Sequence, residues 1–451
     1  MRTNSSYAVE LKNVNRIFNQ TIKVYQSAIK FCLSTFENEW DNLKDIESSK
    51  YQAAAARNLI HSTSKNTAKY QEFDKLFYKL PSYLLTNIIN TSIGILNSYH
   101  TQLDVYNQSD KKGNPPRLQL NHNTFPTFYR NNMSLYTMGE DTIQLKLFID
   151  NDWKYMTFRL KHTDINSIVK HMLPGSKVSC PTLEKHNKKW FMRFNFEDNV
   201  LLNKTPIRNQ SVLAVDLGIN TCTVCAVIKY DGTVTARKFI DFPVEKDHLS
   251  HLLNKIKRLQ RRYKGHNTDK MWRRVKNLNT ELARKTADEI VKMAVNYNVS
   301  AIVFEHLDMN GRKSGSKKQR LHMWNKCTIQ DMTTTKAHKN GIRISRICTK
   351  YTSRLAFDGS GMVIRGKNAG FKNNKVCRFP SGKVYNCDLS ASYNIGARYF
   401  IREIEKFYTL KPTSKYISLW SDIQTKVPGV SRRTQNTLST LKLIHQCINA
   451  A

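Results

Sequence analysis

Apolar residues recur at every third or fourth position near the start of the chain, which is the spacing of one face of an α-helix. The first run begins at about residue 14 and comprises Phe18, Ile22, Tyr25, Ile29, Cys32 and Phe36. A second run follows the helix breaker Pro81 and comprises Leu84, Ile88, Ile89, Ile93 and Leu96. These runs predict a helical domain over residues 14–110, preceded by residues 1–13 as a candidate strand of the next domain.

The hydrophobic period changes to two after the sequence YNQSDKKGNPPRLQ, whose Gly, Pro and polar residues end the helical part. Two alternating runs separated by the turn sequence DND predict a β-hairpin, with Ile143, Leu145, Leu147 and Ile149 before the turn and Met156, Phe158 and Leu160 after it. The pattern returns at Trp190, Met192, Phe194 and Phe196. A β-rich, barrel-like domain is therefore predicted over residues 118–207.

Two short apolar runs farther along the chain each end in an acid. SVLAVD ends at Asp216 and SAIVFE ends at Glu305, and uninterrupted apolar runs of this length are typical of buried parallel strands. We predict an α/β domain over residues 208–402, with a helical insertion at 246–298 and a helical tail at 403–451.

The charge balance points to a polyanionic partner, because 72 Lys and Arg residues oppose 35 Asp and Glu residues and the formal net charge is +37. The sequence has no long apolar run, lipidation motif or signal-peptide core, so no membrane partner is expected. Nine cysteines without a disulfide-like framework are typical of a reducing compartment. We predict a cytoplasmic nucleic-acid-binding protein.

Three acids are candidates for one site: Asp216 and Glu305 at strand ends, and Asp388 at the beginning of a predicted helix. Taken one at a time they have ordinary explanations, since a carboxylate often caps a helix or ends a strand at the solvent boundary. Brought together, they would repel one another unless a divalent cation lay among them. Oxygen ligands favour Mg²⁺ or Mn²⁺, and two such ions could hydrolyse a phosphodiester.

The predicted insertion is strongly basic. Ten Lys or Arg residues oppose the single acid Asp269: Lys255, Lys257, Arg258, Arg261, Arg262, Lys264, Lys270, Arg273, Arg274 and Lys276. An inner stripe is formed by Leu252, Leu253, Ile256, Leu259 and Tyr263. A solvated charged face is one explanation. Contact with a nucleic-acid backbone is favoured, because like charges at this density repel without phosphates alongside.

The sequences LAVDLGIN, IVFEHLD and CDLSASYNIGAR resemble the three RuvC motifs of the TnpB family, which are transposon-encoded RNA-guided nucleases related to miniature type V CRISPR effectors. The helical stretch between the first two motifs and the later YTSR are also similar. The resemblance covers roughly residues 211–400, and the N-terminal half only in its order of elements. It implies an α/β RNase H-like (RuvC) nuclease domain, preceded by a helical recognition domain and a β-barrel-like wedge domain.

This resemblance implies an RNA-guided DNA endonuclease with Asp216, Glu305 and Asp388 as catalytic metal ligands for Mg²⁺ or Mn²⁺. Asn394 and Ile395 match the NI that follows the last acid. The implied partners are a guide RNA and a target DNA, in a monomer or homodimer, in a prokaryotic cytosol. Residues 311–320, within NGRKSGSKKQR, are a candidate loop covering the site until a target is paired.

The chain departs from the family at its four-cysteine zinc site, a degenerate zinc-finger region at 345–387. Ala356, Gly359 and Pro380 stand where three ligands would fall, and only Cys377 is kept. Because a structural zinc site needs about four ligands, we predict no bound zinc and a small loop or sheet held by other contacts. Cys348 and Cys387 lack the family spacing.

The CxxC pair Cys222 and Cys225 lies on a predicted strand, where residues three apart face opposite sides, so both are expected to be core residues.

Two other functions stay open. A nuclease-inactive RNA-guided DNA-binding regulator fits the missing zinc ligands but not the complete set of three acids. An RNase H-like recombinase or junction resolvase would not explain the large helical and β-rich regions before the α/β domain.

Overall fold

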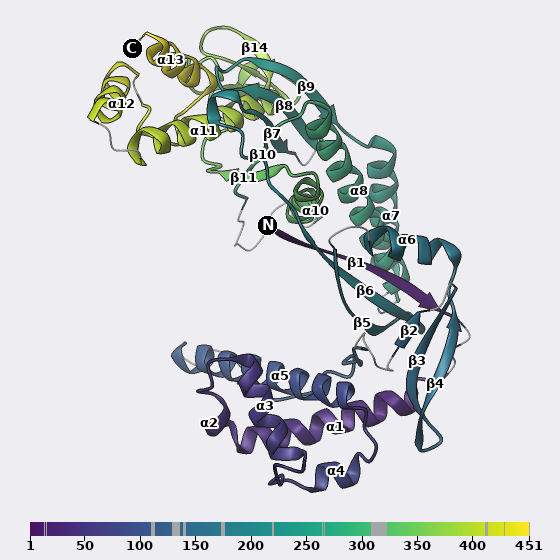
Figure 1. The fold of residues 1–451 in the computed structure, drawn as a ribbon. Helices are drawn as coiled ribbons and strands as arrows, with labels where there is room; N and C mark the ends of the chain where they lie inside the picture. The colour runs from purple at the N-terminus through teal and green to yellow at the C-terminus, as the bar shows by residue number, and fades with distance from the viewer. Residues whose placement is uncertain are drawn as a thin grey trace. The chain divides into compact units, whose positions relative to one another are not determined.

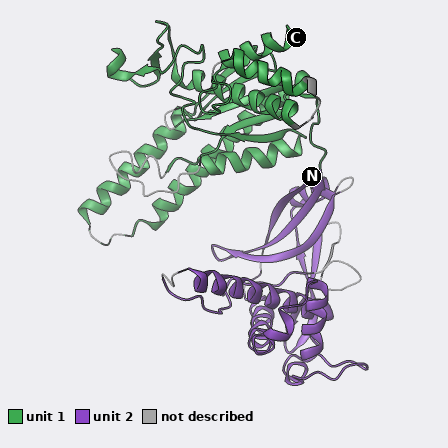
Figure 2. Cartoon of the chain, turned by 90° about the vertical axis from the view of Figure 1, so that its left-hand side faces the viewer, with its two compact units in different colours: residues 1, 200–451 green, residues 2–199 purple. Residues whose placement is uncertain are grey.

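The computed structural model of the chain describes all residues except 13, 15, 110–112, 129–135, 139–140, 173–175, 219–220, 264, 266, 308–322, 411–413, 428 and 451. It contains two compact units (Figure 2), one of residues 2–199 and the other of residue 1 with residues 200–451. The predicted helical and β-rich domains therefore lie within a single unit. The candidate loop 311–320 lies outside the described residues.

The N-terminal unit contains the two long helices predicted from the apolar runs. Its helices are α1 (Asn19–Asn38), α2 (Trp40–Leu43), α3 (Ser49–Ile60), α4 (Glu72–Leu76) and α5 (Ser82–Gln108). Tyr25, Ile29 and Phe36 of α1 share one core with Ile88 and Leu96 of α5. The periodicity thus identified the buried faces of both helices correctly.

The strands of this unit form two three-stranded antiparallel sheets around a second core. The first has the order β1-β6-β5 and is made of β1 (Arg2–Leu11), β5 (Lys177–His186) and β6 (Lys189–Asn199). The second has the order β2-β3-β4 and is made of β2 (Tyr136–Met138), β3 (Thr142–Ile149) and β4 (Asp152–Arg159), with α6 (His162–Met172) following. β3 and β4 are the predicted hairpin. The described pairings contain no closed barrel, and the barrel-like wedge remains a prediction.

The C-terminal unit is an α/β domain built on a five-stranded mixed sheet of order β11-β10-β7-β8-β9 (Figure 1). Its strands are β7 (Ser211–Leu217), β8 (Thr223–Lys229), β9 (Val234–Ile240), β10 (Ala301–Glu305) and β11 (Arg343–Ile347). β7, β10 and β11 run parallel, whereas β8 is antiparallel to both of its neighbours. The first two motif strands are therefore adjacent and parallel, as the sequence predicted.

Helices cover both faces of this sheet (Figure 1). One face packs on α11 (Cys387–Leu410), against which α12 (Ser414–Lys426) and α13 (Leu438–Asn449) lie, and the other on α8 (Asp269–Asn296) and α10 (Lys326–Lys339). α7 (Pro243–Arg262) lies against α8. Alternate residues of β7 belong to the hydrophobic cores on the two faces of the sheet. Val212 and Ala214 face α11, whereas Leu213 and Val215 face α8. The central strands β7, β8 and β10 are thus buried on both sides, which explains their uninterrupted apolar runs.

The smaller elements lie around this domain. They are the 3₁₀ helices η1 (Ile207–Asn209) and η2 (Gly366–Ala369), and the strands β12 (Ile364–Arg365), β13 (Val376–Arg378) and β14 (Val384–Asn386), which form a small antiparallel sheet.

The predicted boundary between residues 402 and 403 is wrong. α11 continues to Leu410, and its buried residues Ile404 and Tyr408 share a core with Leu441 of α13. The tail is therefore part of the α/β domain, because its helices complete the apolar face of α11. None of the described helices combines the length and the hydropathy that a membrane-spanning segment requires.

Candidate active site

Two of the three candidate acids come from adjacent strands in register. The ladder between β7 and β10 ends with the pair Val215 and Phe304. The next residues are Asp216 and Glu305, so their backbones lie side by side at the strand spacing of about 4.8 Å. Because side chains alternate along a strand, both carboxylates belong to the face that Ala214 presents to α11.

The third acid is carried by α11, which lies very close to the sheet. A Cβ atom added at Gly396 would lie 2.5 Å from Cδ1 of Ile228 and 3.2 Å from Cβ of Ala214, so any larger residue would force these neighbours or the helix to shift. Asp388 lies about 12 Å earlier along the helix axis. Hydrogen bonds from Asn394 of α11 to Thr352, and from Thr352 to Glu305, link this helix to the end of β10, and the negative charge of Asp388 raises the pKa of Asp216.

Asp388 is not the cap of α11. Asn386 occupies the N-cap position, where its Oδ1 accepts a hydrogen bond from the backbone N–H of Leu389 at 2.9 Å. Asn386 therefore caps the helix, and capping does not explain the presence of Asp388 at this position.

Asp216 is the acid that both of the others influence. Burial is the main cause of its raised pKa, and the negative charges of Glu305 and Asp388 raise that pKa further, whereas Arg365 lowers it. Neither Asp216 nor Asp388 has a side-chain hydrogen-bond partner among the described residues. Their oxygens are thus available to a ligand.

The charges of two basic residues, Arg365 of β12 and Lys375 just before β13, act on Asp388. Burial raises the pKa of Asp388, and the positive charges of Arg365 and Lys375 oppose that rise. Nε and Nη2 of Arg365 are buried and have no hydrogen-bond partner among the described residues. This guanidinium therefore offers donors beside the carboxylates without an acceptor of its own.

Glu305 is held by a residue of the YTSR sequence. The hydroxyl of Thr352 donates to Oε1 of Glu305, and Nδ2 of Asn394 donates to the carbonyl of Thr352 at 3.0 Å. Burial raises the pKa of Glu305, while Thr352 and then the charge of Arg398 oppose that rise. Asn394, from the third motif, thus positions Glu305 of the second motif through Thr352.

Arg398 orders the segment that leads to Thr352. It is only 4% exposed, and burial lowers its pKa to about 10. Its guanidinium donates to four backbone carbonyls, those of Cys348, Lys350, Thr434 and Asn436. Sequence reasoning did not select Thr352, Arg365, Lys375 or Arg398, although Thr352 and Arg398 lie within motifs that carried the resemblance.

The structure contains no group of three or more His, Cys, Asp or Glu side chains, within the residues that it describes, arranged to hold a metal ion. The three acids are electrostatically coupled but do not surround a single point. Their role as metal ligands is therefore a proposal.

The degenerate zinc-finger region is the small sheet of β12, β13 and β14. Ala356, Cys377, Phe379 and Cys387 form its apolar core, against which Phe357 packs. The thiols of Cys377 and Cys387 share a hydrogen bond that lowers the pKa of Cys377 and raises that of Cys387. Hydrophobic contacts thus hold this sheet together, and the absence of zinc stays a prediction.

The two CxxC cysteines are both buried. Cys225 belongs to the core beneath α8, and Cys222 lies just before β8.

The basic residues of the insertion lie on the helical pair α7 and α8. Nine of the ten are described, and all nine are exposed: Lys255, Lys257, Arg258, Arg261, Arg262, Lys270, Arg273, Arg274 and Lys276. We call these nine residues the basic face. None of them forms an ion pair with a described residue, whereas Arg284 on the same helix pairs with both Glu281 and Asp288.

The predicted inner stripe of α7 is correct in part. Leu252, Leu253 and Ile256 pack against Val275 of α8. Tyr263 is 58% exposed, so its assignment to the stripe was wrong. The reason is that α7 ends at Arg262, and the helical period no longer applies beyond it.

Comparisons with known proteins find a family model and a curated relative that match parts of the chain. The model of the Aq_aa04 family matches residues 5–149. The TnpB-like protein aq_aa05 of Aquifex aeolicus (strain VF5) is 26% identical over 235 residues, which cover 47% of this chain and 74% of that protein.

Two solved structures match most of the chain. The Cas12f1–sgRNA–target DNA complex contains a chain with a TM-score of 0.50 and 13% identity, and the match covers 84% of this chain and 81% of that one. The mini-RNA-guided endonuclease CRISPR-Cas_phi3 has a TM-score of 0.46 and 11% identity, and the match covers 87% of this chain and 92% of that one. The resemblance to TnpB-like proteins that the three motifs predicted is thereby confirmed.

Proposed function

We propose that this protein is an RNA-guided DNA endonuclease that hydrolyses phosphodiesters at Asp216, Glu305 and Asp388 with Mg²⁺ or Mn²⁺. The observation that carries the proposal is the coupling of three acids, distant in sequence, at one end of the α/β sheet. Both other acids raise the pKa of Asp216. The name of the TnpB-like relative and the sgRNA and target DNA in the Cas12f1 complex support the guide and the substrate.

The donor set suits a hard divalent cation. All three candidate ligands are carboxylates, and those of Asp216 and Asp388 have no protein partner among the described residues. Asp216, Glu305 and Asp388 are the residues that would hold such ions. Such ions supply Lewis-acid activation of a water and of the scissile phosphate.

The surrounding residues have separate tasks in this proposal. Thr352 keeps the carboxylate of Glu305 in one orientation. Arg365 donates its buried, unpartnered N–H groups to a phosphate oxygen of the substrate. The basic face holds the nucleic-acid backbone without reading its sequence. Sequence is read by base pairing between the guide RNA and the target DNA, and the N-terminal unit binds guide and heteroduplex.

The deciding experiment is to express the chain with its native flanking locus, sequence the RNA that co-purifies, and measure DNA cleavage with and without Mg²⁺. Asp216→Ala is the inactive variant, and Asp422→Ala, which removes an exposed acid on α12, is its matched control. Cleavage that follows the sequence of the RNA and is lost only in Asp216→Ala supports the proposal. RNA-directed binding without cleavage would indicate a regulator, and cleavage independent of RNA would indicate a recombinase or resolvase.

A further inference from the structure

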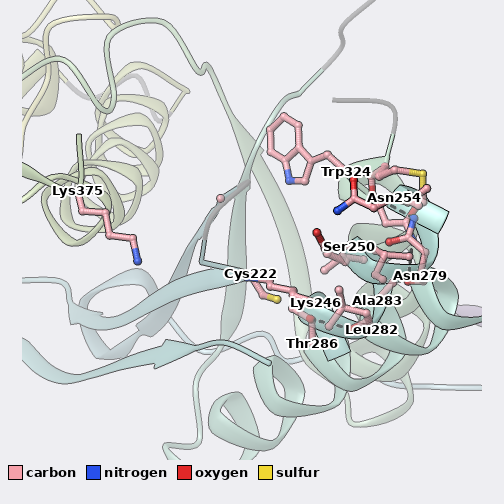
Figure 3. Close-up of a pocket in the computed structure, with 16 residues that line it drawn as sticks. Cys222, Lys246, Ser250, Asn254, Asn279, Leu282, Ala283, Thr286, Trp324 and Lys375 are labelled. Atoms are coloured by element: carbon pink, nitrogen blue, oxygen red, sulfur yellow. Dashed lines mark hydrogen bonds between the residues drawn. The ribbon is translucent and has the colours of Figure 1, made fainter. Parts of the chain in front are cut away.

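A cavity of about 630 Å³ lies between α7, α8, the beginning of α10 and the end of β7 (Figure 3). This volume is within the range of about 300–1,000 Å³ that is usual for small-molecule sites. Its apolar wall comprises Leu249, Leu253, Leu282, Ala283, Ile329 and Trp324. No acid is among the described residues that line it.

The cavity borders the candidate active site. Gly218, which lines it, follows Asp216 by two residues. Lys375, on the opposite side of the cavity in Figure 3, is, after Arg365, one of the two positive charges that oppose the burial-raised pKa of Asp388. A group bound in the cavity would therefore be a close neighbour of any phosphate held at the carboxylates.

Three polar groups face this space without a partner. Nε1 of Trp324 is buried and has no hydrogen-bond partner among the described residues. Asn254 and Ser250, one turn apart on α7, have no side-chain partner in the described part of the chain, and Figure 3 shows both beside the indole nitrogen of Trp324. A buried donor without an acceptor is unfavourable, so a ligand that supplies an acceptor would relieve it.

We propose that this cavity receives a nucleobase of the DNA strand being cleaved, next to the scissile phosphate. A flat ring fits between aliphatic side chains and the indole of Trp324, because bases stack on aromatic faces. The amide of Asn254 offers the donor and acceptor that base edges match. Lys375 lies where the attached phosphate would run, and the lack of a lining acid disfavours a cationic ligand.

This inference rests on the proposed function and narrows its substrate. A base can enter the cavity only when it is unpaired and unstacked from its neighbours. The strand must therefore be single-stranded at the point of cleavage.

The test uses single-stranded DNA oligonucleotides, complementary to the co-purified RNA, each with one abasic site at a successive position. Cleavage of each oligonucleotide is measured with the RNA complexes of four proteins: wild type, Asn254→Ala, Trp324→Phe and the control His248→Ala. His248 is an exposed residue of α7 that does not line the cavity. We expect one abasic position near the cut to slow wild-type and His248→Ala cleavage by about tenfold. Asn254→Ala and Trp324→Phe should cleave the intact oligonucleotide more slowly than wild type does. In these two variants, the abasic site should also reduce the cleavage rate by a smaller factor than in wild type.

The outcomes separate the two proposals. Cleavage that abasic sites slow equally at every position, or by the same factor in the cavity variants as in wild type, would overturn the nucleobase site and leave the endonuclease intact. If wild type does not cleave any oligonucleotide in Mg²⁺, the proposed function fails and the cavity proposal fails with it. Because Trp324→Phe keeps an aromatic ring and Asn254 is exposed, both variants should fold, as thermal unfolding will show.

Discussion

The hydroxyl of Thr352 donates a hydrogen bond to Oε1 of Glu305, linking the YTSR sequence to the end of β10. This contact is the largest of the effects that hold the pKa of Glu305 down against burial. Asn394 holds the backbone of Thr352 in turn. Three separate stretches of sequence thus determine the orientation and the charge of one carboxylate.

Replacing Thr352 with Val should slow cleavage most strongly at acidic pH. Without the hydroxyl, the pKa of Glu305 rises further, so the carboxylate is protonated at a higher pH and activity is lost earlier as pH falls. A hydrogen bond to a charged group contributes enough for a loss of about tenfold. The measurement is the cleavage rate against pH. Thr352→Ser should restore the wild-type profile, and a Val variant with an unchanged acid limb would contradict this account.

Asp216→Asn should stabilise the metal-free protein at neutral pH. The pKa of Asp216 is raised in the folded state, so the folded protein favours the neutral acid, and ionisation above that pKa destabilises it. The cost is present above the folded pKa and vanishes below the unfolded value of about 3.9. Each kcal/mol corresponds to about 2–4 °C in Tm for a domain of this size.

Thermal unfolding in EDTA at neutral and at strongly acidic pH checks that expectation. The gain should appear only at neutral pH, and Asp422→Asn, which changes an exposed acid, should show none. A lower Tm for Asp216→Asn at neutral pH would refute the electrostatic argument.

Arg365→Gln should reduce cleavage by about 100-fold, the usual size of the effect when one buried donor to a reacting oxyanion is removed. DNA affinity, measured by fluorescence anisotropy, should stay close to wild type, because we propose that the basic face makes the backbone contacts. Arg346→Gln, at an exposed arginine on β11, is the control. Equal losses of affinity and cleavage would argue against a role for Arg365 at the scissile phosphate.

Gly396→Ala should displace α11 and with it Asp388. The added Cβ would clash with Ile228 and Ala214, and overpacking of a core usually costs about 1–3 kcal/mol. Both the free energy of unfolding and the cleavage rate should fall. Gly94→Ala on α5 is the matched control, since its Cβ would meet nothing within 4 Å and should stabilise that helix by up to about 1 kcal/mol. Similar effects of the two substitutions would show that the close approach has no role.

Neutralising Lys257, Arg258 and Arg261 together should weaken DNA binding equally for all sequences. For every phosphate that the variant no longer neutralises, the slope of log affinity against log salt should become shallower by about 0.9 for a duplex. The measurement is a salt titration of binding. Arg284→Gln is the control, because two acids already neutralise Arg284. An unchanged salt slope would mean that the basic face is only solvated.

Local patterns identified the elements of the fold but not all of their limits. The apolar period located α1 and α5, and alternation located β3 and β4, because each element buries one face of itself. The residues at which a helix or domain begins and ends depend on the other elements that pack against it. The period could not show that α12 and α13 complete the core of α11, nor that α7 ends before Tyr263.

The sequence by itself predicted the α/β domain, the basic insertion and the three candidate acids Asp216, Glu305 and Asp388, since each strand, helix or motif that indicates them is a short local pattern. Only the tertiary structure revealed Asn386 as the cap, Thr352 and Arg398 as supports, and the cavity beside the acids. The contacts of Thr352 and Arg398 join residues that the sequence separates by dozens of positions, whereas the Asn386 cap is a local hydrogen bond to Leu389 that hydrophobic periodicity does not report. The hydrophobic periodicity of a single segment does not indicate which distant residues are in contact.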